Sequence, residues 1–336
     1  MNPSEPYLSL AAAALAVLLS SAITWAIRPL MLRHAMAKPN ARSSHRIPTP
    51  QGAGIAVIAA TLVAAIAVMT ALGPSEMKIP AVVFGATLFI AAVGLADDVH
   101  SIPVLPRLLM QAAAVAAVVF AAPESSRIFD VLPLWLERGL VLLAGLWFVN
   151  LVNFMDGLDL MTAAEAVPVS AAIVLLGWLG EIPASTTLVA AALCGALLGF
   201  TPFNRPVAKI FLGDVGSLPI GLLLGWCLLQ LASHQQLAAC LLLPMYYLTD
   251  ATVTLVRRIA RREPFWAAHR SHYYQRATDN GFTVWQVVGE VFTLNVVLAA
   301  LAIASTRLQS PVVALLLVAA GALAVVLTLY RFSRPR

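Results

Sequence analysis

Residues 79–98 read IPAVVFGATLFIAAVGLADD, an uncharged apolar run that ends in two adjacent aspartates. A run of this length is predicted to cross a bilayer as a helix, because about 20 mostly apolar residues span the hydrocarbon core. The rest of the chain has the same character: 60% of its 336 residues are hydrophobic and only 11% are charged. Soluble domains carry about 25% charged residues. The composition therefore predicts an all-α, polytopic membrane protein, with 1–336 forming a single integral-membrane domain.

Eleven apolar runs are expected to be membrane helices, and ten is the alternative count because several runs are short. Their continuous apolar character excludes a strand barrel, in which apolar and polar residues alternate. The eleven runs are 8–27, 53–72, 79–96, 107–122, 136–153, 164–180, 185–200, 217–233, 236–256, 284–306 and 310–330.

The segments between these runs form two sets of very different charge. Eleven helices place on one side the loops 28–52, 97–106, 154–163, 201–216 and 257–283 and the tail 331–336. Counting Arg107, this side carries 17 of the 21 Lys and Arg residues, and basic residues favour the cytoplasm. We therefore expect this side to be cytoplasmic and the N-terminus to be outside. The net charge of +5 is then typical of a protein facing an anionic membrane surface, and no nucleic-acid module is present.

Acidic residues lie at or near the ends of four of the runs. They are Asp97-Asp98, Asp156 with Asp159, Asp214 and Asp250. Charge in or near hydrocarbon is costly, so it usually marks a functional site. Aspartate oxygens suit Mg²⁺, which takes one or two carboxylates and completes its coordination with water and substrate phosphates. A solvated helix end or an N-cap is the alternative for Asp97, Asp98 and Asp214, and Asp250 is assigned no chemistry.

Two loops combine polar or basic residues with glycine. In NLVNFMDGLD (150–159), Asn150, Asn153 and Asp156 are three residues apart and share a helix face, where they can hold a metal, a sugar or a base. A polar helix cap is the alternative. In NRPVAKIFLGDVGS (204–217), Arg205 and Lys209 can neutralise phosphate, and glycines leave space on either side of the aspartate.

The fifth loop of the basic side is the longest. Pro264 ends the preceding helix, and His269-Arg270-Ser271-His272 follows. Two histidines and an arginine in a loop that faces carboxylates indicate anion binding, and we expect His269, Arg270 and His272 to act on phosphate. Anchoring to anionic lipid is the favoured interpretation of the arginines before the proline, which are Arg257, Arg258, Arg261 and Arg262.

Taken in this order, the motifs resemble those of the polyprenyl-phosphate N-acetylhexosamine-1-phosphate transferases (glycosyltransferase family 4). The resemblance extends from Ser44 to Gln275 and rests on Asp97-Asp98, on NFMDGLD (153–159), on FLGDVGS (211–217) and on HRSH (269–272). It implies an enzyme of the bacterial cytoplasmic (inner) membrane with a cytoplasmic Mg²⁺ site, Mn²⁺ being the alternative ion. Such an enzyme moves an N-acetylhexosamine-1-phosphate from a UDP-amino sugar to undecaprenyl (polyprenyl) phosphate and releases UMP. Homo-oligomerisation is left open.

The resemblance and the residue chemistry together assign roles to individual side chains. Asp97, Asp98, His269 and His272 are expected to be catalytic, and Asp98 and Asp214 to hold the metal. Substrate binding is expected from Asn153, Asp156, Asp159, Arg205, Lys209, Arg270 and Arg46. Direct attack by the lipid phosphate is favoured over a covalent aspartyl-phosphate, because a phosphate monoester with a second pKa of about 6 is already mostly dianionic at neutral pH.

The chain departs from the family pattern at two places, and the second suggests a branch. Ala53 interrupts the glycines after Pro-Thr-Pro-Gln, and HRSHYYQ (269–275) replaces the histidine run typical of the peptidoglycan branch. The chain therefore looks closer to the branch that initiates O-antigen, lipopolysaccharide and other cell-envelope glycans. The alternatives are a phospho-N-acetylmuramoyl-pentapeptide transferase, a secondary transporter, in which acidic residues lie near the bilayer midplane, and a lipid-binding scaffold.

Overall fold

A computed structural model describes residues 4–37, 48–70, 78–264, 269–308 and 310–336. Nine helices within these ranges are long and apolar enough to cross a membrane. They are α1 (Glu5–His34), α3 (Lys78–Val99), α4 (Val104–Ala121), α5 (Leu134–Met155), α6 (Met161–Trp178), α7 (Ala184–Phe200), α8 (Asp214–Ser233), α12 (Val284–Leu308) and α13 (Pro311–Phe332). The expectation of an all-α, multi-pass membrane protein is confirmed, and the count of eleven spans stays a prediction.

The remaining elements are short. They are β1 (Met36–Ala37), β2 (Thr49–Pro50), α2 (Gly54–Met69), η2 (Thr201–Phe203), α9 (Leu237–Leu242), α10 (Met245–Ala260) and α11 (Tyr273–Asp279). The apolar helix α2 corresponds to the expected run 53–72. The antiparallel pair β1–β2 is the only sheet among the described residues.

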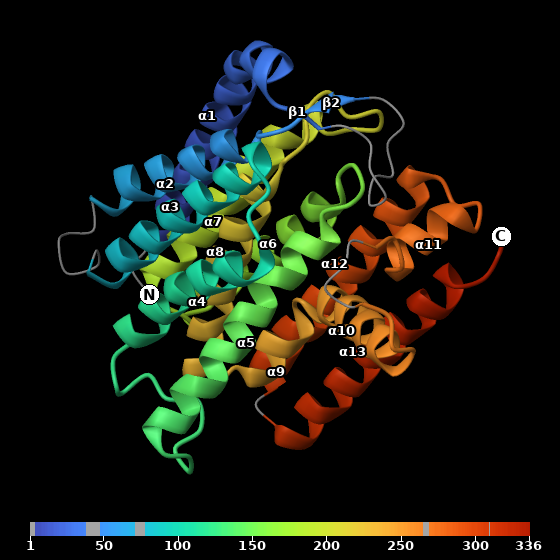
Figure 1. Cartoon of the computed structure of the whole chain (residues 1–336). Helices are drawn as coiled ribbons and strands as arrows, with labels where there is room; N and C mark the ends of the chain where they lie inside the picture. The colour runs from blue at the N-terminus through green and yellow to red at the C-terminus, as the bar shows by residue number, and fades with distance from the viewer. Residues whose placement is uncertain (1–3, 38–47, 71–77, 265–268, 309) are drawn as a thin grey trace.

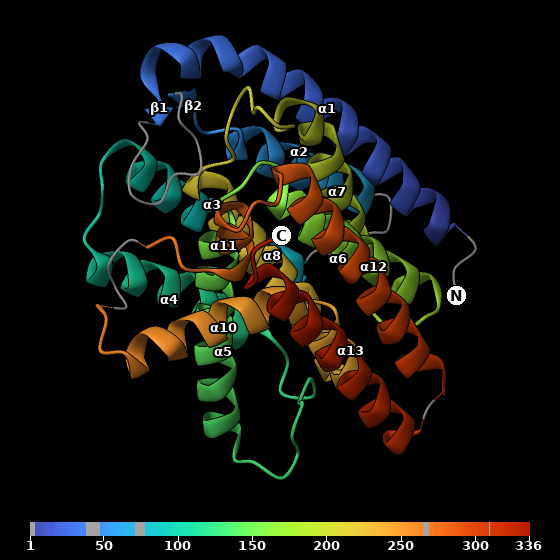
Figure 2. The ribbon, with the colours of Figure 1, turned by 90° about the vertical axis from the view of Figure 1, so that its right-hand side faces the viewer.

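The expected run 236–256 is not one helix. It is split into α9 and α10 at Pro244, which precedes the first residue of α10. Proline has no N–H and its ring clashes with the preceding turn, so a continuous helix breaks there. In Figure 2, α10 runs across the direction of α12 and α13. Hydropathy is uniform along this run, so it did not indicate the break.

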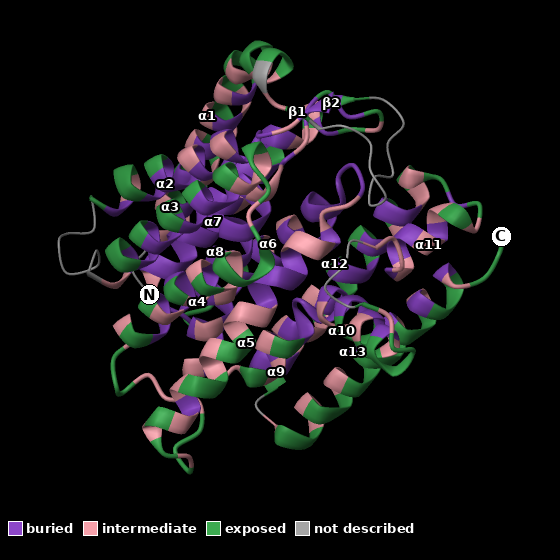
Figure 3. Cartoon of the chain, in the orientation of Figure 1, coloured by how far each residue is buried: buried purple, intermediate pink, exposed green. Residues whose placement is uncertain are grey.

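The helices pack around α8, the most enclosed of the candidate spans, while α13 is the most exposed (Figure 3). α3 and α5 pack against α8, α1 packs against α7 and α2, and α12 joins α6 to α13 (Figure 1). Small residues allow the closest approach: a Cβ on Gly54 would lie 2.3 Å from the Gly216 backbone, and one on Gly94 would lie 2.3 Å from the Asp214 carbonyl oxygen. The first turn of α8 is thereby held between α2 and α3.

Segments that the sequence assigned to one side of the membrane meet in the structure. The Phe211 N–H donates to the Pro50 carbonyl (2.8 Å), and the Gly54 N–H donates to the Leu212 carbonyl (2.8 Å), so the first and fourth loops lie together. At the other edge, the Arg336 N–H donates to the Asn280 carbonyl (3.0 Å). The two chain ends lie far apart, on opposite sides of the molecule in Figure 1. Which side is cytoplasmic stays a prediction.

Candidate active site

The first turn of α8 carries one of the predicted aspartates and is capped by another. Gly213 precedes the helix with φ +79°, a left-handed conformation that glycine adopts without strain. The backbone N–H groups of Asp214 and Val215 then donate to the two oxygens of the Asp98 carboxylate, at 2.9 and 3.0 Å. Gln51 Nε2 donates to the same carboxylate. Asp98 therefore holds the end of α8 from the neighbouring helix α3.

An arginine joins the other two carboxylates of this cluster. Arg107 Nη1 lies 2.5 Å from Asp97 Oδ2 and 3.7 Å from Asp214 Oδ2. Asn153, at the end of α5, donates to Asp214 Oδ1 (2.7 Å) and to Ser217 Oγ (2.9 Å). The Arg107 Nε–H is buried and has no partner among the described residues. We call Asp97, Asp98, Arg107 and Asp214 the carboxylate cluster.

The net negative charge of the carboxylate cluster suits a divalent cation. Three carboxylates against one guanidinium leave an excess of two negative charges, and a carboxylate offers about four lone-pair positions. The Asp214 side chain is 28% exposed, against 9% for Asp97, while both Asp98 oxygens already accept backbone N–H groups. No group of three His, Cys, Asp or Glu side chains within the described ranges forms a ready-made metal site. Metal binding by Asp98 and Asp214 stays a prediction.

The other acidic residues of the third loop hold the loops in place. Asp156 follows the last residue of α5 and accepts from Thr162 Oγ1 (2.5 Å). Asp159 is buried and accepts the Ala208 N–H (3.1 Å), which ties the third loop to the fourth. Leu160 follows in the left-handed region with φ 62°, and its N–H donates to Asn204 Oδ1 (2.7 Å). Asp156 and Asp159 therefore have structural contacts within the loops, and their role in substrate binding stays a prediction.

Within the described part of the chain, neither Arg205 nor Lys209 forms an ion pair with the carboxylate cluster. Arg205 and Lys209 are exposed, and Lys209 lines a cavity with residues of α1. Arg46 lies outside the described residues. The cation that does reach the aspartates is Arg107, which the sequence argument used only for its charge. The sequence contains an indication of this role, because Arg107 stands at the start of an apolar run, close behind Asp97-Asp98.

The histidine loop is organised by Asp250, to which the sequence argument gave no role. This carboxylate is fully buried on α10 and accepts the backbone N–H groups of Tyr273 (3.0 Å) and Tyr274 (3.2 Å) at the start of α11. Tyr246 and Thr254 donate their hydroxyls to it from the same helix. His272 Nδ1 lies 3.4 Å from its Oδ1. Asp250 is thus the N-terminal cap of α11 and the partner of His272.

The other residues of this loop differ in direction. His269 lies against His272, with ring centroids 4.9 Å apart, and its Nδ1 is 2.9 Å from Ser271 Oγ. Arg270 instead pairs with Asp279 and Thr278, each at 3.1 Å. Arg258 is buried in an ion pair with Glu263 (2.9 Å) and donates to the Pro264 carbonyl, and anchoring of this arginine group to anionic lipid stays a prediction.

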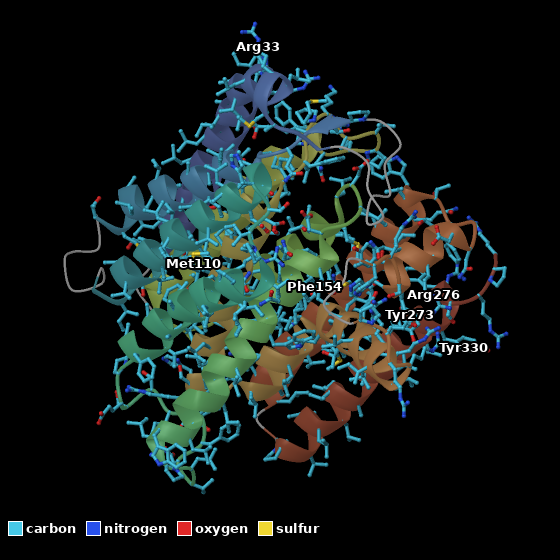
Figure 4. The ribbon with its side chains drawn as sticks, viewed as in Figure 1. Arg33, Met110, Phe154, Tyr273, Arg276 and Tyr330 are labelled. Carbon is cyan, nitrogen blue, oxygen red and sulfur yellow. The ribbon has the colours of Figure 1, made fainter. Side chains whose placement is uncertain are left out.

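The end of α5 joins the histidine loop to the carboxylate cluster. Tyr274 donates its hydroxyl to the Phe154 carbonyl (3.0 Å), one residue after Asn153. A Cβ on Gly157 would lie 2.2 Å from the Tyr274 hydroxyl, so only glycine allows this docking. Figure 4 shows Phe154 between Met110 on α4 and the α11 residues Tyr273 and Arg276.

An apolar cavity of about 330 Å³ lies beside these elements. It is formed by α4, α5, α8, α9 and α10, and its lining includes Val118, Phe148, Gly221, Trp226, Leu241 and Leu248. Phe148 lies about one turn before Asn153 on α5, and Gly221 lies about two turns after Asp214 on α8. The two helices that carry the polar site therefore also line the cavity, which we call the apolar groove.

Comparison with known proteins finds sequence similarity to one family of membrane transferases. Residues 80–232 match Glycosyl transferase family 4. The family 4 stretch includes α3, α4, α5 and α8 and therefore the whole carboxylate cluster, whereas the histidine loop lies beyond it. We find relatives from more than one branch.

The phospho-N-acetylmuramoyl-pentapeptide-transferase of Shouchella clausii is 26% identical over 278 residues, covering 75% of this chain and 81% of the relative. The probable undecaprenyl-phosphate N-acetylglucosaminyl 1-phosphate transferase of Bacillus subtilis is 25% identical over 284 residues, covering 78% and 76%. The decaprenyl-phosphate N-acetylglucosaminephosphotransferase of Mycolicibacterium smegmatis is 32% identical over 220 residues, covering 59% and 54%. The similarity to family 4 therefore does not separate the branches.

Proposed function

We propose that this protein transfers an N-acetylhexosamine-1-phosphate from a UDP-sugar to polyprenyl phosphate in the bacterial inner membrane, releasing UMP on the cytoplasmic side. The observation that carries the proposal is that α5 and α8 contribute residues both to the polar site and to the apolar groove. A lipid phosphate needs a polar site for its headgroup and an apolar surface for its hydrocarbon chain, and the two helices supply both. The similarity to glycosyl transferase family 4 supports the same reaction class.

In this reaction an oxygen of the lipid phosphate attacks the sugar-bearing phosphorus of the UDP-sugar. A new P–O–P bond forms, the bond to the UMP oxygen breaks, and UMP leaves with the electron pair. Arg107 is placed to bind a phosphate oxygen, because its buried Nε–H has no partner among the described side chains. When bound by the aspartates, Mg²⁺ supplies charge neutralisation for the diphosphate. Direct attack is favoured because both Asp98 oxygens accept backbone N–H groups and Asp97 pairs with Arg107.

We further propose that the product initiates a surface glycan of the O-antigen or lipopolysaccharide type. The sequence HRSHYYQ (269–275) supports this branch. The peptidoglycan reaction is the second candidate, because a phospho-N-acetylmuramoyl-pentapeptide-transferase matches over three quarters of the chain.

The test is UMP release by the purified protein with Mg²⁺, polyprenyl phosphate and a panel of UDP-N-acetylhexosamines. The panel includes UDP-N-acetylmuramoyl-pentapeptide. Release that requires the lipid and a simple UDP-N-acetylhexosamine supports the proposal, and release with the pentapeptide substrate alone assigns the peptidoglycan branch. A transporter or scaffold releases no UMP with any pair, which would falsify the proposal.

Two variants test the metal assignment. Asp214→Asn and Asp98→Asn are expected to abolish transfer, because losing a ligand removes several kcal/mol of transition-state charge stabilisation. The control is Asp130→Asn, which changes an exposed aspartate between α4 and α5. All three proteins should be inserted and monodisperse. Turnover near the control at saturating Mg²⁺ in either cluster variant contradicts that residue's role.

A further inference from the structure

The end of α1 nearest the β1–β2 pair reaches lipid headgroup depth. No charged residue lies between Glu5 and Arg28 on this helix. At a rise of 1.5 Å per residue, these two residues are about 34 Å apart along the axis, close to the hydrocarbon thickness of about 30 Å. Trp25, one turn earlier than Arg28, is 75% exposed, and exposed tryptophans are typical of the membrane–water interface. If the uncharged stretch of α1 spans the hydrocarbon, Arg28 lies at the depth of the phospholipid phosphates.

A cavity of about 580 Å³ opens at this depth between α1 and the fourth loop. It is lined by Trp25, Ala26, Arg28, Pro29, Phe203 and Lys209. Arg28 Nε donates to the Lys209 carbonyl (3.4 Å), which links the two cationic residues across the cavity wall. None of the lining residues is acidic. Neither cation forms an ion pair with a described acidic residue.

This cavity is separate from the apolar groove. The groove is formed by α4, α5, α8, α9 and α10, whereas α1 packs against α7 and α2. Figure 2 shows α1 along the upper edge of the molecule and α10 in its lower half. Lys209 therefore lines a cavity other than the apolar groove, and its assignment to substrate phosphate stays a prediction. Its charge is available for another anion.

We propose that this cavity binds the headgroup of an anionic phospholipid from the surrounding bilayer. Arg28 and Lys209 bind the phosphodiester, Trp25 lies at the glycerol and upper acyl region, and the acyl chains follow the exposed apolar face of α1. The fit rests on charge and depth together: two cations without an acidic partner among the described residues border a cavity at phosphate depth. A bound lipid would tie α1 to the fourth loop, which also carries Asp214. The proposal is independent of the reaction assigned above.

The test measures lipid retention in nanodiscs or detergent by native mass spectrometry. The wild-type protein and the variants Arg28→Gln, Lys209→Gln and the double variant are titrated with phosphatidylglycerol, and with phosphatidylcholine for comparison. Each cation near an anionic surface changes affinity roughly fivefold. We expect roughly fivefold weaker phosphatidylglycerol binding for each single variant, a larger loss for the double variant, and no change for phosphatidylcholine.

Arg33→Gln is the matched control, because Arg33 lies on the same helix end but extends away from the other elements in Figure 4. Equal losses for Arg33→Gln and Arg28→Gln mean general surface charge and overturn the proposal. Displacement of the lipid by inorganic phosphate at low millimolar concentration assigns a free-phosphate site and also overturns it. The proposal is also overturned if Lys209→Gln raises the KM for polyprenyl phosphate and leaves the phosphatidylglycerol affinity unchanged. The ligand of the cavity is then the substrate.

Discussion

Replacing Asp250 by asparagine tests whether this buried carboxylate positions the histidine loop. The change removes the negative charge and one of the two acceptor oxygens, while four donors and His272 converge on the group. Hydrogen bonds to a charged acceptor contribute about 1.5–3 kcal/mol each, and a lost N-cap costs about 1 kcal/mol. We expect weaker docking of α11 and a misplaced His272 ring.

The expected kinetic effect follows from these magnitudes. A loss of about 1.5–3 kcal/mol in the transition state lowers kcat roughly 10-fold to 100-fold. The KM for the UDP-sugar should change less, because the carboxylate cluster is untouched. Asp279→Asn is the control: this carboxylate is exposed, lies at the other end of α11 and pairs with Arg270. Its turnover should stay within about twofold of wild type, since exposed ion pairs contribute about 0–1 kcal/mol at most sites.

A double-mutant cycle gives the decisive measurement. If Asp250 acts through His272, adding Asp250→Asn to a His272→Ala protein costs little further turnover, because residues that act as a unit are strongly non-additive. UMP release is measured in single turnover at saturating substrates, with fluorescence-detected gel filtration as the folding control. Full additivity of the two changes, or Asp279→Asn as damaging as Asp250→Asn, would refute the positioning role.

Three further predictions concern the histidine loop, the packing of α11 and the topology. His272→Ala should lower single-turnover UMP release strongly, and Arg261→Ala should lower it little. Arg270→Ala should have an intermediate effect, because Arg270 pairs with Asp279 and Thr278. Equal, small effects of all three variants would favour lipid anchoring of the loop. Gly157→Ala should lower the melting temperature and the activity, because the added Cβ meets the Tyr274 hydroxyl. Gly85→Ala is the control: no atom lies within 4 Å of its added Cβ, so the melting temperature should stay the same or rise slightly. Similar behaviour of the two variants would contradict the docking of Tyr274 against Gly157. The topology is tested in a protein that lacks its three native cysteines, with an impermeant thiol reagent applied from outside. The reagent should label Val131→Cys, because Val131 is 91% exposed, and should not label Arg262→Cys. The reverse pattern would mean that the expected topology is inverted.

Sequence alone predicted the features that depend on local composition. Long uncharged runs set the membrane helices, because no other backbone conformation except a closed barrel satisfies its hydrogen bonds in lipid. The sequence also indicated that Asp97, Asp98 and Asp214 belong to one site, and the structure places their carboxyl groups around Arg107 and the first turn of α8. Charge at the end of an apolar run was a sufficient signal for these residues.

The features that sequence missed depend on contacts between distant segments. Asp250 receives its donors from its own helix and from residues more than twenty positions later, so its spacing carries no local pattern. Lys209 faces α1 because the fourth loop is fixed by Asp159 at Ala208 and by Pro50 at Phe211. Nothing in the local sequence indicates that Lys209 lies beside α1.

The last turn of α5 explains why these distant contacts form one site. Asn153 holds Asp214 through its side chain, and the next residue, Phe154, holds Tyr274 through its carbonyl. Consecutive residues on one helix end thus contact the metal-binding candidate on one side and the histidine loop on the other. Because α5 also lines the apolar groove, a hydrocarbon chain bound there would press on the same helix. We therefore expect occupancy of the groove to change the spacing between His272 and Asp214 through α5, which contacts both sides of the site.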